Sequence, residues 1–156
     1  MSTVKPIPAG YHTITPYLVV DDARRLITFL EHAFNAKSTI CSQSEDGKTV
    51  HHAELKIGDS MLMVGQACGE HKANPTMLYL YVLDTDATYQ QALKAGGTKL
   101  LDPVNQFYGD RNAAITDFAG NQWWIATHVE DLTPEELKKR SAKAAAEKCC
   151  ADDDCH

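Results

Sequence analysis

The stretch Phe107–His128, FYGDRNAAITDFAGNQWWIATH, alternates between apolar and polar residues as two paired strands do. Successive side chains of a strand point to opposite faces, so Trp123 and Trp124 face opposite ways, and one face of the first run carries Arg111, Ala113 and Ile115. Gly120-Asn121 between the two runs suits a hairpin turn, because both residues tolerate positive φ. The stretch therefore predicts a β-hairpin.

Both faces of this hairpin are partly apolar. A sheet with one face in solvent does not need that pattern, whereas a sheet covered by helices on one side and lining a cavity on the other does. An ordinary hairpin of the core is the competing interpretation.

Length and composition limit the class of protein. The 156 residues suit one domain, and 44% hydrophobic residues are enough for a core. A net charge of −6 leaves no basic stripe to neutralise phosphates, so we expect no nucleic-acid partner. No apolar run approaches the roughly 20 residues that span a bilayer, and the N-terminus MSTVKPIPAG lacks the apolar segment of a signal peptide. We expect no membrane partner.

The five cysteines do not resemble a disulfide framework. Their number is odd, and Cys149, Cys150 and Cys155 crowd the last eight residues. We therefore expect a cytoplasmic protein.

The first half of the chain predicts a β-α-β-β-β unit. ITPYLVVDD gives a strand over Ile14–Val20 and an aspartate cap for a helix over Ala23–Phe34, whose apolar residues fall on one stripe. Alternating runs separated by turn residues then predict three strands, over Lys37–Ser44, Thr49–Ile57 and Ser60–Val64.

After a linker of Gly, His, Asn and Pro at residues 65–75, the second half repeats the first. TMLYLYVLDTD predicts a strand ending in acidic residues, followed by a helix over Ala87–Ala95, a short strand over Thr98–Leu101 and the hairpin. The two halves together therefore form an internal repeat of roughly 60 residues. It predicts an α+β fold of two β-α-β-β-β modules, residues 12–65 and 76–128, in one domain over residues 1–131.

Three motifs span most of residues 14–128: TPYLVVDDARRLITFLEHAFNA, HAELKIGDSMLMV and YGDRNAAITDFAGNQWWIATH. They resemble the vicinal oxygen chelate superfamily of glyoxalases, bleomycin-resistance proteins and extradiol dioxygenases, and within it the PhnB-like branch. The resemblance implies two modules side by side, whose mixed sheets curl around one cavity. That expectation agrees with the two apolar faces of the hairpin.

In metal-dependent members of that superfamily, His, Gln or Glu side chains from the first and last strands of each module hold a divalent ion. Matched through the Asp22 and Asp84 turns, three of these positions fall on Thr15, Met77 and Trp124, and the fourth falls in 60–64, which offers no good ligand. Hard and borderline cations select imidazole or carboxylate instead. We expect no metal in the cavity and predict no cofactor, with a divalent metal as the alternative.

His52 and Glu54 are the imidazole and the carboxylate that alternation places together on the cavity face. Two residues apart on a strand, they project from one side and are our catalytic candidates, able to share a proton or hold a polar group. The competing interpretation is that His52 and Glu54 have no functional role, and that each either has its hydrogen bonds satisfied within the protein or faces solvent. The planar guanidinium of Arg111 suits two interactions equally well. One is with an anionic group of a ligand, and the other is an ion pair with Asp110 or Asp117.

An aromatic-lined pocket is the second expectation for this face. Phenol and indole donors would orient a flat or apolar molecule there. Core packing is the competing interpretation. The candidate ligand-binding residues are Thr15, Tyr17, Met77, Tyr79, Tyr81, Arg111, Gln122 and Trp124.

The C-terminal segment begins with a capping box and a proline at the first helical position, Thr133-Pro134-Glu135-Glu136. It predicts a largely solvated helix within residues 132–148. The acidic end, 149–156, predicts a disordered tail. Its alternative is a site for a soft metal, with the ligand candidates Cys149, Cys150, Cys155 and His156.

Three functions remain open on the sequence alone. The aromatic face and the missing ligands favour a bleomycin-resistance-like protein that binds a small aromatic or amphipathic molecule without the family metal. A divalent-metal-dependent lyase or isomerase of glyoxalase type and a metal-handling protein acting through the Cys/His tail are the alternatives. We also expect a homodimer, because sheet edges need cover and the family often supplies it from a second chain.

Overall fold

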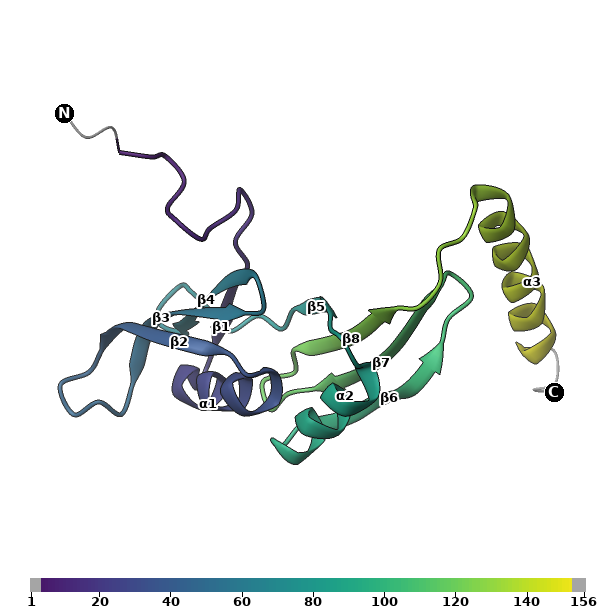
Figure 1. Ribbon diagram of the computed structural model, residues 1–156. Helices are drawn as coiled ribbons and strands as arrows, with labels where there is room; N and C mark the ends of the chain where they lie inside the picture. The colour runs from purple at the N-terminus through teal and green to yellow at the C-terminus, as the bar shows by residue number, and fades with distance from the viewer. Residues whose placement is uncertain (1–3, 153–156) are drawn as a thin grey trace.

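The computed structural model describes residues 4–152, and over this range it contains two four-stranded mixed sheets and three helices (Figure 1). The first sheet has the order β1-β4-β3-β2 and consists of β1 (Tyr17–Val20), β2 (Lys37–Gln43), β3 (Val50–Ile57) and β4 (Ser60–Gln66). The second has the order β5-β8-β7-β6 and consists of β5 (Met77–Tyr81), β6 (Thr98–Asn105), β7 (Asp110–Thr116) and β8 (Gln122–His128). The predicted α+β fold of two β-α-β-β-β modules is confirmed.

The two modules repeat each other down to the helix caps. In each sheet the first strand runs parallel to the fourth, and the other neighbours are antiparallel. Asp22 caps α1 (Ala23–Phe34) by accepting a hydrogen bond from the backbone N–H of Arg25 at 3.0 Å. Asp84 caps α2 (Thr85–Lys94) in the same way, from Ala87 at 3.0 Å. A carboxylate here satisfies one of the unpaired N–H groups at a helix start.

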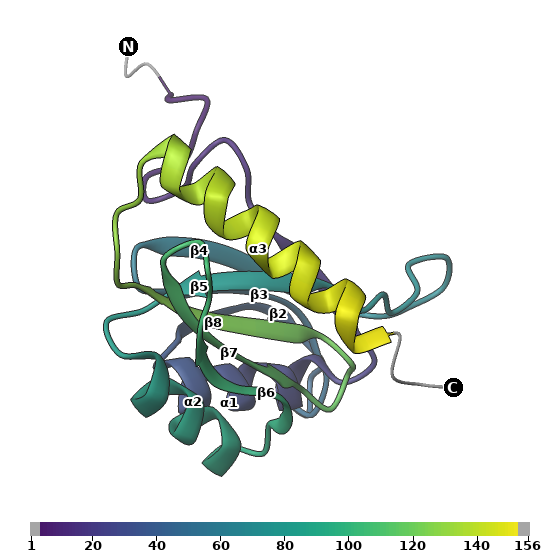
Figure 2. The same cartoon turned by 90° about the vertical axis from the view of Figure 1, so that its right-hand side faces the viewer.

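The core lies between the sheets and the helices α1 and α2, which sit on the same side of both sheets (Figures 1 and 2). The apolar stripe of α1 is buried, and Phe34 at its end packs on Trp123 of the second sheet, with ring centroids 5.2 Å apart. Gln91 of α2 donates to the carbonyl of His32 in α1 at 2.7 Å. The two modules are therefore joined through their helices.

The opposite face of each sheet, called here the helix-free face, is only partly covered. Tyr17, Met77 and Tyr81 on this face expose 52%, 57% and 67% of their surface. The third helix, α3 (Pro134–Asp152), lies beside the second sheet (Figures 1 and 2). Its Arg140 donates two hydrogen bonds of 2.8 Å to Glu130, in the segment between β8 and α3. None of the helices in residues 4–152 is both long and apolar enough to cross a membrane.

Several boundaries differ from those predicted. β1 begins at Tyr17 rather than Ile14, and β4 continues to Gln66, so Gly65 belongs to a strand and not to the linker. β6 runs through Pro103 to Asn105, which its place at the sheet edge and its register shifts permit, since an edge proline need not donate to a neighbour.

The C-terminal helix also exceeds its predicted length. α3 continues to Asp152, so the backbone of residues 149–152 is helical rather than part of a disordered tail. The Lys- and Ala-rich sequence before residue 149 contains strong helix formers and no breaker. The remaining tail candidates, Cys155 and His156, lie outside the described residues.

Candidate functional site

Strand register places the predicted site residues on the helix-free faces in two groups, one on each sheet. On the first sheet, β3 directs His52 and Glu54 to this face, where Glu54 is paired in register with Met63 and Met63 with Tyr17. On the second sheet, Met77 pairs with Gln122 and Tyr79 with Trp124. Among the described residues no side-chain hydrogen bond joins the two groups.

Tyr17 and His52 form the centre of the first group. The hydroxyl of Tyr17 lies 3.0 Å from Nδ1 of His52, and the two rings stack with centroids 5.5 Å apart. The Tyr17 side chain crosses Gly65 to reach His52, because a Cβ at Gly65 would lie 2.6 Å from the Tyr17 hydroxyl. Gly65 therefore provides the space for this contact.

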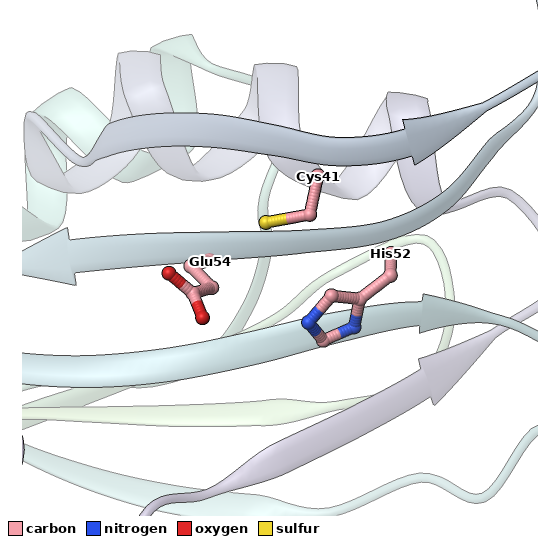
Figure 3. A group of neighbouring side chains, drawn as sticks. All are labelled: Cys41, His52 and Glu54. Carbon is pink, nitrogen blue, oxygen red and sulfur yellow. The ribbon is translucent and has the colours of Figure 1, made fainter. Parts of the chain in front are cut away.

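Cys41 of β2 joins His52 and Glu54, although nothing in the sequence pattern pointed to it (Figure 3). One ligand-type atom from each residue lies within 4.8 Å of the others: the sulfur, a ring nitrogen and a carboxylate oxygen. Cys41 is exposed, and the other two residues are half-buried. This trio combines three kinds of group that bind metals.

Asp110 is the centre of the second group and is only 4% exposed. Its Oδ2 accepts hydrogen bonds from the hydroxyls of Tyr79 and Tyr81, each at 3.0 Å. Its Oδ1 lies 2.9 Å from Nδ1 of His128, the residue paired with it in register on β8. We call these four residues, with Asn112, the Asp110 network.

The hydrogen bonds of the Asp110 network shift the pKa values of its members. Burial opposes ionisation of Asp110, but the hydrogen bonds from His128, Tyr81 and Tyr79 outweigh it and hold the pKa of the carboxyl below its usual range. Hydrogen bonds to Asp110 and Asp131 raise the pKa of His128. Burial raises the pKa of Tyr79, and the bond to Asp110 raises that of Tyr81.

Asn112 extends the Asp110 network into the protein and is fully buried. Its Nδ2 donates to the hydroxyl of Tyr79 at 3.2 Å and to that of Tyr108 at 2.8 Å. Its Oδ1 accepts from Nε2 of Gln106 at 2.9 Å. A buried amide satisfied in this way fixes the Tyr79 ring in place.

The two tryptophans occupy opposite faces of β8, as the alternation predicted. Trp123 is 1% exposed and donates its indole N–H to Asp117 at 2.9 Å. Trp124 is half-buried on the helix-free face and donates to Gln122 at 3.2 Å. The indole of Trp124 is therefore a candidate contact for a ligand on that face.

Arg111 lies on the other side, and its predicted partners were wrong. It shares the helix-covered face of β7 with Ala113 and Ile115, both fully buried. Its guanidinium binds Asp86 of α2 with two hydrogen bonds, of 2.6 and 2.8 Å, and not Asp110 or Asp117. Of the two interactions expected for this guanidinium, a ligand contact and an ion pair, the structure shows an ion pair, formed between strand and helix.

The metal centre implied by the superfamily resemblance does not fit the residues present. Thr15 precedes β1, and the matching positions on the second sheet carry the thioether of Met77 and the indole of Trp124. In β4, the position paired with Tyr17 and Glu54 is Met63. These groups are poor ligands for the hard or borderline cations that the resemblance implies.

Two hollows of the surface are lined by other residues. One, of about 280 Å³, is lined by Arg25 and Phe29 of α1 and by Phe118, whose ring lies 4.2 Å from the Arg25 guanidinium carbon. The other, of about 490 Å³, separates α3 from the loop around Phe107. Neither hollow is lined by the predicted site residues, so the single shared cavity remains an expectation.

Some known proteins are similar to this chain in amino-acid sequence. A 136-residue segment is 35% identical to an uncharacterized protein of Mycobacterium tuberculosis strain H37Rv, covering 80% of this chain and 79% of the relative. An uncharacterized protein of Mycobacterium bovis is also 35% identical over 136 residues, covering 80% of this chain and 89% of the relative.

Solved structures share the fold at low sequence identity. TioX from Micromonospora sp. ML1 has a TM-score of 0.63 at 20% identity, over 76% of this chain and 99% of TioX. A glyoxalase/bleomycin resistance protein/dioxygenase family enzyme from Burkholderia phytofirmans PsJN has a TM-score of 0.60 at 17% identity, over 72% of this chain and 95% of that protein.

The family comparison agrees with the repeated β-α-β-β-β architecture. The model of one superfamily matches residues 10–125, which include both sheets almost to the end of β8. This chain therefore belongs to the glyoxalase/bleomycin resistance protein/dioxygenase superfamily.

Proposed function

We propose that this protein binds a small aromatic or amphipathic molecule on its helix-free faces, without a metal at the first- and last-strand positions of the family. The observation that carries the proposal is the gathering of aromatic rings with polar tips on those faces. Tyr17, Tyr79, Tyr81 and Trp124 all lie there. Such rings supply contact area while the hydroxyl or indole group orients the ligand.

His52 and Glu54 take the role of fixing a polar group of that ligand. Both lie half-buried on the same side of β3, and the Tyr17 contact holds the imidazole in one orientation. A half-buried charged or polar group beside aromatic rings suits an amphipathic molecule better than a purely apolar one.

A second copy of this chain is the partner that we propose. Ligand pockets bury most of their ligand, whereas the helix-free faces of one chain leave Tyr17, Met77 and Tyr81 more than half exposed. Closing these faces against a second copy would provide the missing enclosure and cover sheet edges.

We also propose that the chain belongs to the PhnB-like branch of the superfamily and that the protein is cytoplasmic. The motif HAELKIGDSMLMV, which supports a PhnB-like assignment, forms β3 and β4 and carries His52 and Glu54. Cys41 and Cys68 carry exposed free thiols, which supports a reducing, cytoplasmic environment.

Tryptophan fluorescence tests the ligand site. Benzoate and benzylamine serve as probes because they are small, aromatic and of opposite charge. In the Trp123→Phe variant, either probe should still change the emission of Trp124, since this indole lies half-buried on the helix-free face. In the Trp124→Phe variant the signal should be lost, since Trp123 is buried under the helices.

Near-ultraviolet circular dichroism of both variants controls for the fold, because Trp123→Phe also removes the bond to Asp117. A probe-dependent signal that persists in Trp124→Phe and vanishes in Trp123→Phe would place the ligand on the wrong face for this proposal.

A further inference from the structure

A bulge in β2 places a thiol among the polar groups of the first sheet. Ile40 pairs with Ala53 and Ser42 pairs with His52, so Cys41 between them has no partner in the register. A bulge leaves one extra residue on a strand and re-aims its side chain. Figure 3 shows the Cys41 sulfur directed toward the same space as the His52 ring and the Glu54 carboxylate.

We infer that Cys41, His52 and Glu54 bind a zinc ion. Their ligand-type atoms lie within 4.8 Å of one another, and ligand atoms around a tetrahedral zinc are about 3.5 Å apart, given metal–ligand bonds of about 2.0 to 2.3 Å. Small side-chain rotations close that difference, and Cys41 is exposed and free to make them.

The combination of ligands selects the class of metal. Thiolate and imidazole suit Zn²⁺, whereas Mg²⁺ and Ca²⁺ take oxygen ligands. The thiol releases its proton to solvent when it coordinates the ion. Three protein ligands leave a fourth position for water or for an oxygen of a small molecule.

Tyr17 supplies the outer contact that a metal-binding histidine normally has. Ligating histidines usually donate their other ring N–H to a neighbouring oxygen, which fixes the tautomer. With its proton on Nδ1, His52 donates to the Tyr17 hydroxyl 3.0 Å away, and Nε2 keeps its lone pair. In Figure 3 one ring nitrogen faces the space between the Cys41 sulfur and the Glu54 carboxylate.

Tyr11 gives independent support for a ligand at this place. Its hydroxyl is buried and makes no hydrogen bond of good geometry within residues 4–152. Its neighbouring ionisable side chains include Glu54 and Cys41, two members of the trio. A buried hydroxyl left unpaired beside a carboxylate is expected where a bound group completes the network.

This site differs from both metal sites that the sequence raised. Its ligands come from β2 and β3, not from the first and last strands of the modules, and it does not use the C-terminal cysteines. It shares His52 and Glu54 with the proposed ligand site, but all three of its ligands lie in one sheet, so it does not depend on dimer formation.

The test uses the full-length chain with the tail ligands replaced, as Cys149→Ser, Cys150→Ser, Cys155→Ser and His156→Gln, under reducing conditions. Zn²⁺ affinity is measured by competition with a chromogenic chelator, and Co²⁺ then reports the ligands by its absorption. We expect one Zn²⁺ per chain and a thiolate-to-cobalt charge-transfer band. Loss of an outer contact costs about 10- to 100-fold in affinity, so Tyr17→Phe should weaken binding about tenfold and Cys41→Ser or His52→Gln by more.

Two substitutions of exposed residues are the matched controls. Cys68→Ser removes another exposed thiol, and His51→Gln changes the exposed neighbour of His52 on the same strand. Both should leave Zn²⁺ affinity and the charge-transfer band unchanged. The site does not exist if the tail-replaced chain binds no Zn²⁺, if its Co²⁺ form lacks the band, or if binding survives Cys41→Ser unchanged.

Discussion

At the scale of single residues, Asp110 shows how a buried charge is kept. A buried carboxylate is costly unless it is paired and hydrogen-bonded. Asp110 accepts from Tyr79 and Tyr81 on one oxygen and faces His128 with the other. The result is a fixed negative charge on the helix-free face of the second sheet.

Stability should depend on pH through His128. Its pKa is raised above 6.5 by Asp110 and Asp131, so its stabilising effect is complete below pH 6.5 and is lost as pH rises through the raised value. The pKa of Asp110 is lowered from 3.8, so its own contribution is lost only at much lower pH. We expect His128→Gln to lower the melting temperature more at about pH 6 than at about pH 9.

Thermal melting across that range measures the effect, with His12→Gln as the control at an exposed histidine. If the melting temperatures of wild type and His128→Gln differ by the same amount at every pH, protonation of His128 does not stabilise the fold.

Alternation along a strand predicted the faces of His52, Glu54 and Trp124, because it depends only on neighbours in the chain. It could not predict Cys41, whose direction depends on a bulge, or Tyr11, which lies in a loop without periodicity. The contact between Asp110 and His128 joins residues 18 apart and needs the cross-strand register.

At the scale of the elements, the turn between β7 and β8 is organised by Asp117, which is 5% exposed. Its carboxylate accepts from the backbone N–H groups of Ala119 and Asn121, from the Asn121 side chain and from the indole of Trp123, at 2.9 to 3.1 Å. One side chain thus closes the hairpin and ties it to the core.

Asp117→Ala should lower the free energy of unfolding by about 2 to 4 kcal/mol, because it leaves buried donors without partners. The matched control is Asp59→Ala in the turn between β3 and β4, where the aspartate is exposed and accepts a hydrogen bond from the Ser60 hydroxyl at 3.2 Å. That change should cost no more than about 0.5 kcal/mol. Urea denaturation measures both, and equal losses at the two turns would contradict the role given to Asp117.

An element was predicted well where the local sequence marks both of its ends. α1 begins after its aspartate cap and ends before Asn35, which adopts the left-handed conformation with φ of 54°. β6 was predicted too short because Asp102-Pro103 has the sequence of a stop, and only its edge position makes the proline acceptable. Edge position is a property of the sheet that the local sequence does not contain.

At the scale of the whole molecule, α1 and α2 pack together and leave the helix-free faces directed away from them (Figure 1). The internal repeat predicted two modules but not the relation between their sheets, because that relation depends on contacts such as Gln91 with His32 and Phe34 with Trp123. The second copy that we propose as a cover for the helix-free faces is likewise a property that no local pattern contains.

We expect light scattering at tens of micromolar to give the mass of a dimer. The edges of both sheets are unpaired within residues 4–152, and Met77 on the edge strand β5 is 57% exposed. Met77→Asp should shift the equilibrium toward monomer without unfolding the chain, since a side chain this exposed contributes little to the monomer core. Leu83→Asp, at a fully exposed position between β5 and α2, is the control and should leave the mass unchanged. A wild-type protein that stays monomeric at this concentration would exclude a second copy as the cover of the helix-free faces, and any ligand there would have to bind to one open chain.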